Sequence, residues 1–162
     1  MRKETTDSQL PGSDICCISF DLQQVLFVPK LTHSDMFYLS QLSCYNLGIH
    51  LSDTNRAFMC MWHEGVSGRG GNEIASTILK VLNSGITEEK HLLVWSDNCA
   101  GQNKNRMVIY VLVFLVLHQV FDTIEYNFLI SGHSFMCCDR DFALIEKRKR
   151  VMKAIIPNIY TK

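Results

Sequence analysis

The fold is decided by a stretch in the middle of the chain, residues 91–106, HLLVWSDNCAGQNKNR. Its apolar part, His91–Ser96, predicts a buried strand that ends at Asp97. Small and polar residues then predict a loop. The apolar segment from Asn105, which can cap a helix, to about Val120 predicts a helix that is buried nearly all round. A strand, a loop that opens with an acid and a helix indicate one unit of an α/β domain.

Upstream of this unit, the sequence predicts a long strand and a hairpin. Residues 15–28, ICCISFDLQQVLFV, are rich in β-formers and predict one strand that ends at Pro29. Asp53, Thr54 and Asn55 are turn residues between two further strand-like segments, SCYNLGIHLS and RAFMCMWHE. These two segments are therefore expected to pair as a hairpin.

Helices are indicated by periodicity and by caps. A short helix is expected at 34–42, with Ser34 as its cap, and a longer one from Asn72, its expected N-cap, to Asn83. Downstream, the alternating segment Thr123–Ile130 predicts a strand, residues 131–134 a turn, and the segment from about Asp139 to Lys153 a last helix. The last helix should turn Phe142 and Ile145 towards the core.

The resulting order is β-β-β-α-β-α-β-α, with the short extra helix between the first two strands. It predicts a mixed five-stranded sheet with helices packed on it, the order of the ribonuclease-H-like fold, although other α/β folds share it. We expect residues 15–156 to form this domain, residues 1–14 a disordered lead-in, and residues 157–162 a tail that is truncated. No internal repeat is present.

Composition limits the class of protein. The chain has 162 residues, 47% hydrophobic and 20% charged, so it can bury a core, and its formal net charge of zero excludes a whole-chain basic field. Seven cysteines, no CxxC motif and a polar N-terminal segment favour an intracellular protein with reduced thiols. The apolar run Met107–Leu117 would span about 16 Å as a helix, half a bilayer core, so no membrane segment is expected.

Two acids stand where an α/β sheet places its chemistry. Asp21 lies within an apolar strand, where a lone carboxylate is costly to bury, and Asp97 ends another strand. If these strands are parallel neighbours, both acids meet at the same sheet edge. Two carboxylates repel each other unless a cation lies between them, and oxygen ligands favour Mg²⁺ or Mn²⁺.

A third acid would complete such a metal site. Asp139 is the preferred candidate and Glu146 the second, since a spacing of seven puts both on one helix face, whereas Asp141 points elsewhere. His133 could contact a phosphate or a leaving group. Structural roles compete with this interpretation, because Asp97 could cap a turn and Asp139 could be the N-cap of the last helix.

Candidate contacts to nucleic acid surround these acids. Gln102 and Asn103 can orient an acid or contact phosphate without adding charge, and Lys104 and Arg69 can meet a phosphate. The loop around Arg69, SGRGGNE, matches no phosphate-binding motif, and a flexible connection explains it equally well. The basic segment 146–153, EKRKRVMK, is a solvated helix end or a nucleic-acid contact.

The segments SFDLQQVL, YNLGIH, WSDNCAGQNKN and SGHSFMCCDRDFALIEK together resemble a domain of unknown function found in uncharacterised insect and other animal proteins and thought to derive from transposases. The resemblance covers roughly residues 15–156. That family is distantly similar to DDE-type transposases with a ribonuclease-H-like core. The resemblance implies that Asp21 and Asp97 match the first two catalytic acids, and Asp139 or Glu146 the third.

Two functions follow as hypotheses. The first is a nuclease-like domain in which metals held by Asp21, Asp97 and Asp139 act on a phosphodiester, most simply of DNA in the nucleus. The second is an inactive, domesticated module that binds protein or nucleic acid. One reason for it is Cys137, which stands near a position where family members often carry glutamate. The other is length, because relatives are usually longer and this chain resembles a catalytic core alone.

Overall fold

The computed structural model describes residues 14–28, 41–84, 88–99, 101–129 and 136–151. Within these ranges the chain forms an α/β fold with one open, mixed sheet of six strands and with three helices. In chain order the elements are β1 (Ile15–Leu22), β2 (Leu26–Val28), β3 (Leu42–Leu51), β4 (Arg56–His63), α2 (Gly71–Leu82), β5 (His91–Ser96), α3 (Arg106–Leu117), β6 (Thr123–Phe128) and α4 (Cys137–Val151). Most of the helix expected at 34–42 and the turn expected at 131–134 lie outside the described residues, but Leu42 already belongs to β3.

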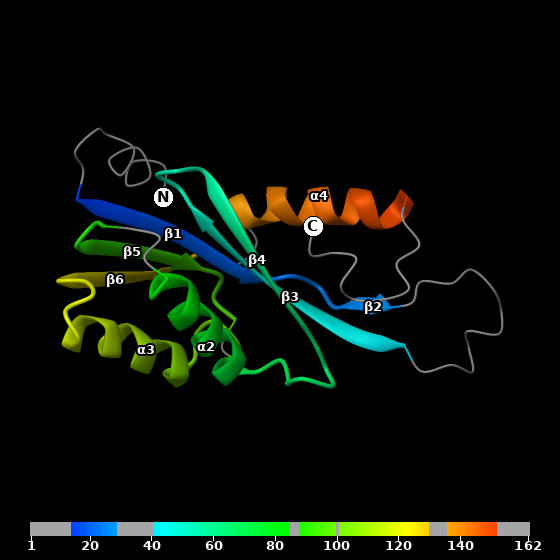
Figure 1. The fold of residues 1–162 in the computed structure, drawn as a ribbon, viewed down its shortest axis with the longest axis horizontal. Helices are drawn as coiled ribbons and strands as arrows, with labels where there is room; N and C mark the ends of the chain where they lie inside the picture. The colour runs from blue at the N-terminus through cyan, green and yellow to red at the C-terminus, as the bar shows by residue number, and fades with distance from the viewer. Residues whose placement is uncertain (1–13, 29–40, 85–87, 100, 130–135, 152–162) are drawn as a thin grey trace.

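The sheet combines an antiparallel half with a parallel half. β3 pairs antiparallel with β4 along one edge, which confirms the predicted hairpin, and antiparallel with β1 along the other. β1 pairs parallel with β5, and β5 parallel with β6. Helices α2 and α3 lie on one face of the sheet, and α4 lies on the other (Figure 1). The parallel pairing of β1 and β5, on which the expected meeting of Asp21 and Asp97 depended, is confirmed.

The expectation of one continuous strand over residues 15–28 is wrong, because a bulge divides it into β1 and β2. Leu22 is paired with Leu47, and Leu26 with Cys44. Between these two pairs, the segment that joins β1 to β2 has one residue more than the facing part of β3. At the break, Gln23 donates its backbone N–H to the Asn46 carbonyl (3.0 Å) and accepts a hydrogen bond from the Asn46 amide (2.9 Å). The sheet therefore has six strands where five were expected.

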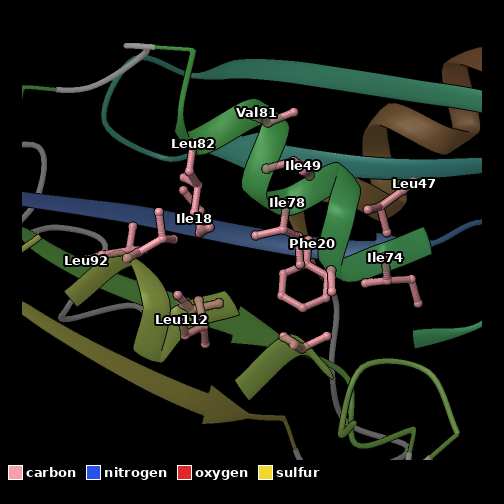
Figure 2. Packing of buried hydrophobic residues seen from close by; sticks show 14 of the residues in the cluster. Ile18, Phe20, Leu47, Ile49, Ile74, Ile78, Val81, Leu82, Leu92 and Leu112 are labelled. Atoms are coloured by element: carbon pink, nitrogen blue, oxygen red, sulfur yellow. The ribbon is translucent and has the colours of Figure 1, made fainter. Parts of the chain in front are cut away.

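The main hydrophobic core lies between the sheet and helices α2 and α3. From β1 it receives alternate residues, among them Ile18 and Phe20, as the two-residue period of a strand requires. Figure 2 shows the Phe20 ring beneath α2, close to Ile74 and Ile78, two residues of the predicted apolar face of that helix. The other β1 residues, including Ser19 and Asp21, consequently face the side of the sheet that α4 covers.

Helix α2 begins one residue before Asn72, the N-cap expected from the sequence. Its N-cap is Gly70, whose backbone N–H donates to Glu73 Oε2 (3.0 Å). The helix then starts with Gly71, where a Cβ atom would lie only 2.6 Å from Nδ2 and Oδ1 of Asn105. Close contact between α2 and the start of α3 therefore requires a glycine at this position.

Helix α3 is less buried than its composition predicted. Only Val108, Leu112 and Leu115 are buried, a single stripe with helical spacing. Large apolar side chains on its other faces are exposed: Ile109 (42%), Tyr110 (61%), Val113 (50%), Phe114 (44%) and Leu117 (75%). The expectation of a helix buried nearly all round is therefore wrong, because neighbours among the described elements cover only one of its sides.

Two further expectations can be compared with the described residues. The seven cysteines form no disulfide, as the sequence indicated, and four of them are buried. Across the described ranges, no helix has both the length and the apolar character that crossing a membrane requires.

Candidate functional site

Asp21 and Asp97 lie side by side at the edge of the sheet where the parallel strands end. In the parallel pairing of β1 with β5, Phe20 is opposite Ser96, so the next residues along the two strands are Asp21 and Asp97. Both strands run in the same direction, and their carboxyl ends meet at this edge, where open α/β sheets collect their ligands. The sheet itself therefore brings these carboxylates together, without help from a flexible segment.

A buried amide bridges the two acids. Nδ2 of Asn103 donates to Oδ1 of Asp21 (3.3 Å) and to Oδ1 of Asp97 (2.5 Å). The Asn103 side chain is completely buried, and its Oδ1 atom has no hydrogen-bond partner among the described residues. Of the two roles that the sequence suggested for Asn103, orienting the acids is the one that this burial supports.

The loop that carries Asn103 is fixed at both ends. Asp97 Oδ1 accepts the backbone N–H of Cys99 (3.2 Å), and the Cys99 carbonyl accepts the backbone N–H of Lys104 (2.9 Å). Asn105 caps α3 by accepting the backbone N–H of Met107 (2.9 Å), as its place before the apolar run indicated. Asp97 thus has the turn-capping role of the structural interpretation and also faces Asp21.

Tyr126 of β6 supports the same loop. Its hydroxyl donates to the Asn103 carbonyl (2.8 Å) and lies 2.9 Å from Oγ of Ser96. Burial, with a contribution from the charge of Asp97, raises the pKa of Tyr126 to about 12, while the contact with Ser96 acts in the opposite direction. Tyr126 therefore stays a neutral donor near neutral pH. This role was not predicted from the sequence, where the only signal was a tyrosine within a strand whose apolar and polar residues alternate.

The electrostatics of the pair are unfavourable in the absence of a cation. Burial, followed by the negative charge of Asp97, raises the pKa of Asp21 from 3.8 to about 6. Hydrogen bonds from the Leu22 backbone and from Asn103 oppose this rise, and the charge of Asp139 adds to it. Near neutral pH, above this pKa, Asp21 is mostly ionised, and a neutral amide bridges it to Asp97.

The two candidates for the third acid lie on the face of α4 that covers β1. Asp139 is the third residue of α4 and so is not its N-cap, as the structural interpretation had it. Its side chain accepts the backbone N–H of Met136 (2.8 Å), which helps to cap the helix, and its charge acts on Asp21. Glu146 accepts a hydrogen bond from Nε2 of Gln23 (3.3 Å), beside the bulge. Asp139 is thus the candidate that acts on the pair. In the described part of the chain, however, no three His, Cys, Asp or Glu side chains are grouped closely enough to hold a metal ion.

A second polar contact under α4 was not anticipated from the sequence. Nδ1 of His50, on β3, lies 2.9 Å from Oδ2 of Asp141, and both side chains are nearly buried, at 3% and 14% exposure. Next to this pair, the Cys138 thiol lies 3.7 Å from Oγ of Ser19, and burial raises the pKa of that thiol to about 12. These contacts fix α4 on the sheet. The available signal was the alternation of Asn46, Gly48 and His50 along one strand face.

The candidate nucleic-acid contacts lie at different depths. Lys104 is exposed, and its Nζ lies 5.3 Å from the centre of the Phe128 ring. Arg69 is exposed in the loop before Gly71, the residue that contacts Asn105, and Gln102 is partly buried. His133 lies outside the described residues. Lys104 is therefore an exposed cation next to Asn103 in the sequence, and Arg69 is an exposed cation in the loop before α2.

Comparison with known proteins gives a family but no function. A family model described as a domain of unknown function, DUF7869, matches residues 34–158, most of the chain. No curated protein matches the sequence. The family match confirms the resemblance to a domain of unknown function. The matched range includes Asp97, Asn103 and Asp139, whereas Asp21 precedes it.

Proposed function

We propose, since this chain belongs to the DUF7869 family of unknown function, that it is a transposase-derived, DDE-type nuclease-like domain acting on nucleic-acid phosphodiesters with Mg²⁺ or Mn²⁺. One observation carries the proposal: Asp21 and Asp97 meet at the carboxyl ends of adjacent parallel strands, and no basic side chain is found to pair with either of them in the described ranges. A divalent cation would supply the missing positive charge.

The donor atoms of the site fit such a cation. Asp21 and Asp97 offer carboxylate oxygens, and the Asn103 amide that holds them together is neutral, so the net charge of the site is negative. Hard oxygen donors suit Mg²⁺ and Mn²⁺, and Mg²⁺ is commonly bound by one or two carboxylates together with water and substrate phosphate. Asp139 is proposed as the third acid, because its charge already acts on Asp21.

The side chains around the pair fit phosphodiester chemistry. When bound, the metal would lower the barrier by activating water or a 3′-hydroxyl and by neutralising charge on the leaving oxygen. Asp21 and Asp97 would hold that positive charge at a fixed place, because both lie on paired strands. The exposed cations Lys104 and Arg69 would contact the phosphate backbone.

The sheet topology supports the finer proposal that the fold is ribonuclease-H-like. β1 has an antiparallel β3–β4 pair on one side and two parallel strands, β5 and β6, on the other; of the described helices, only α4 lies on the face opposite α2 and α3 (Figure 1). This is the arrangement that the predicted element order suggested. DNA is the proposed substrate, and the nucleus the proposed location.

A substitution at Asp97 tests the proposal. We expect Mg²⁺- or Mn²⁺-dependent cleavage of DNA by the wild-type chain, and its loss in Asp97→Asn, because the substitution removes one of the two charges but keeps the shape of the side chain. Asp122→Asn is the matched control: Asp122 is exposed just before β6 begins, at the opposite ends of the parallel strands. Cleavage that survives Asp97→Asn would refute the assignment. RNA tested alongside DNA establishes the substrate.

A second candidate function is an inactive module that binds a protein or nucleic-acid partner. The observation that favours it is the exposed apolar surface of α3, which includes Tyr110 and Leu117 at 61% and 75% exposure. The two candidates differ in their response to metal. An active core should gain thermal stability in Mn²⁺, because binding to the native state shifts the folding equilibrium, whereas an inert module should show no shift.

A further inference from the structure

We infer that Asn103 is itself a metal ligand, and that its amide turns over when the cation binds. In the structure its NH₂ group donates to both carboxylates, and with a cation bound its carbonyl oxygen would face the cation instead. This inference rests on the proposed function, because it assigns a residue to the proposed metal site. It goes beyond an all-acid site by adding an amide to the ligands.

Only the NH₂ half of the Asn103 amide is hydrogen-bonded within the described residues. Nδ2 of Asn103 donates to both Asp21 and Asp97, whereas Oδ1 of the same amide is buried and has no partner in the described part of the chain. A buried amide oxygen without a hydrogen bond destabilises the folded state. One half of the amide therefore holds the acids together, and the other half is unsatisfied.

Turnover of the amide would give Oδ1 a partner, the cation, and would move Nδ2 to the buried position that Oδ1 leaves. Rotation about the Cβ–Cγ bond exchanges Nδ2 and Oδ1, which are nearly equal in size, so the packing around Asn103 hardly changes. The two hydrogen bonds from Nδ2 would be lost, but metal coordination by Asp21 and Asp97 replaces them. Oδ1 would then point between the carboxylates and complete a set of three oxygen donors from three side chains.

The backbone around Asn103 favours rotation of the side chain over movement of the loop. The Asn103 carbonyl is held by the Tyr126 hydroxyl at 2.8 Å, and the nearby Asn105 caps α3 and packs against Gly71. A ligand on a fixed backbone needs only its terminal torsion to change, and that torsion is broad for an amide. The site is consequently built for exchange at the amide alone.

Two substitutions at residue 103 separate a ligand from a hydrogen-bond donor. Asn103→Ala removes both the oxygen and the N–H groups, while Asn103→Asp keeps an oxygen and removes the N–H groups. If Asn103 is a ligand, Asn103→Ala should weaken Mn²⁺ binding about tenfold or more. Asn103→Asp should bind Mn²⁺ at least as tightly as the wild type. Asn72→Ala, which truncates an exposed amide on α2, is the matched control and should bind like the wild type.

The affinity for Mn²⁺ is measured by calorimetric titration. A second readout, which needs no variant to fold, is the NMR spectrum of the side-chain amides in ¹⁵N-labelled wild-type protein as Mg²⁺ is added. The NH₂ signals of Asn103 should move, and those of Asn72 should stay. Equal loss of Mn²⁺ affinity in Asn103→Ala and Asn103→Asp would mean that the amide acts only as a hydrogen-bond donor. Wild-type affinity in Asn103→Ala would exclude any contact between Asn103 and the cation. Either result overturns the inference. Absence of Mn²⁺ binding in the wild type would instead refute the proposed metal site itself.

Discussion

Replacement of Asp21 by asparagine should stabilise the metal-free protein, although it removes a proposed metal ligand. The pKa of Asp21 rises from 3.8 to about 6 because the folded state buries its charge beside that of Asp97. At about 1.36 kcal/mol for each pKa unit, ionised Asp21 lowers the free energy of unfolding by about 3 kcal/mol. The asparagine side chain would be neutral, could accept the same hydrogen bond from Asn103 and could donate to Asp97, so most of this cost should disappear.

The sign of the pH dependence follows from proton binding. Between 3.8 and about 6 the folded state holds a proton on Asp21 that the unfolded state has lost, so stability falls as pH rises through this range and then stays constant. Asp21→Asn should therefore stabilise by about 1–3 kcal/mol at about pH 8 and by much less at about pH 4.

Urea denaturation in EDTA at both pH values measures this difference, and Asp122→Asn, at an exposed acid, is the control that should change little. An Asp21→Asn protein that is less stable than the wild type at the higher pH, or equally affected at both, would show that Asp21 carries no unfavourable charge. With Mn²⁺ present the order should reverse, since only the wild type retains both carboxylates of the pair.

Two further predictions concern the packing around the site. Gly71→Ala should destabilise the fold by about 1–3 kcal/mol and weaken Mn²⁺ binding, because its Cβ would lie 2.6 Å from Nδ2 and Oδ1 of Asn105. The control is Gly101→Ala, whose Cβ has no neighbour within 4 Å. It should change neither the stability measured by urea denaturation nor the binding of Mn²⁺. Asp141→Ala leaves the buried His50 ring without its partner at 2.9 Å and should cost about 1–3 kcal/mol in urea denaturation; a cost no larger than that of Asp122→Ala would contradict a structural role for the pair.

The sequence predicted the parallel part of the sheet because the relevant signals are local. His91–Ser96 is a short apolar run between polar segments, and the α/β unit that contains it leads to a strand parallel to β5. The cap at Asn105 and the placement of Asp21 and Asp97 follow from the same local reasoning. These features needed only periodicity and the geometry of a β–α connection.

Features that depend on distant partners could not be predicted. The bulge between β1 and β2 leaves the composition of the apolar run unchanged, and it is defined by Asn46 of another strand. His50 and Asp141 are 91 positions apart, so no local pattern connects them. The apolar composition of α3 indicated a helix, but how many of its sides are covered depends on the number of neighbours. In each case tertiary contacts, which are absent from local patterns, decide the outcome.

The electrostatic cost at Asp21 supports the proposed metal site. Asp97 has a structural reason to be where it is, because it accepts the Cys99 N–H at the start of a turn, and Asp139 has one because it caps α4. Asp21 lies within a strand and caps nothing. Its ionised form costs about 3 kcal/mol, a large share of the roughly 5–15 kcal/mol by which domains are typically stable. A neutral side chain would avoid that cost, whereas a cation between Asp21 and Asp97 would turn the repulsion into attraction. The metal-binding interpretation therefore accounts for the one acid that capping leaves unexplained.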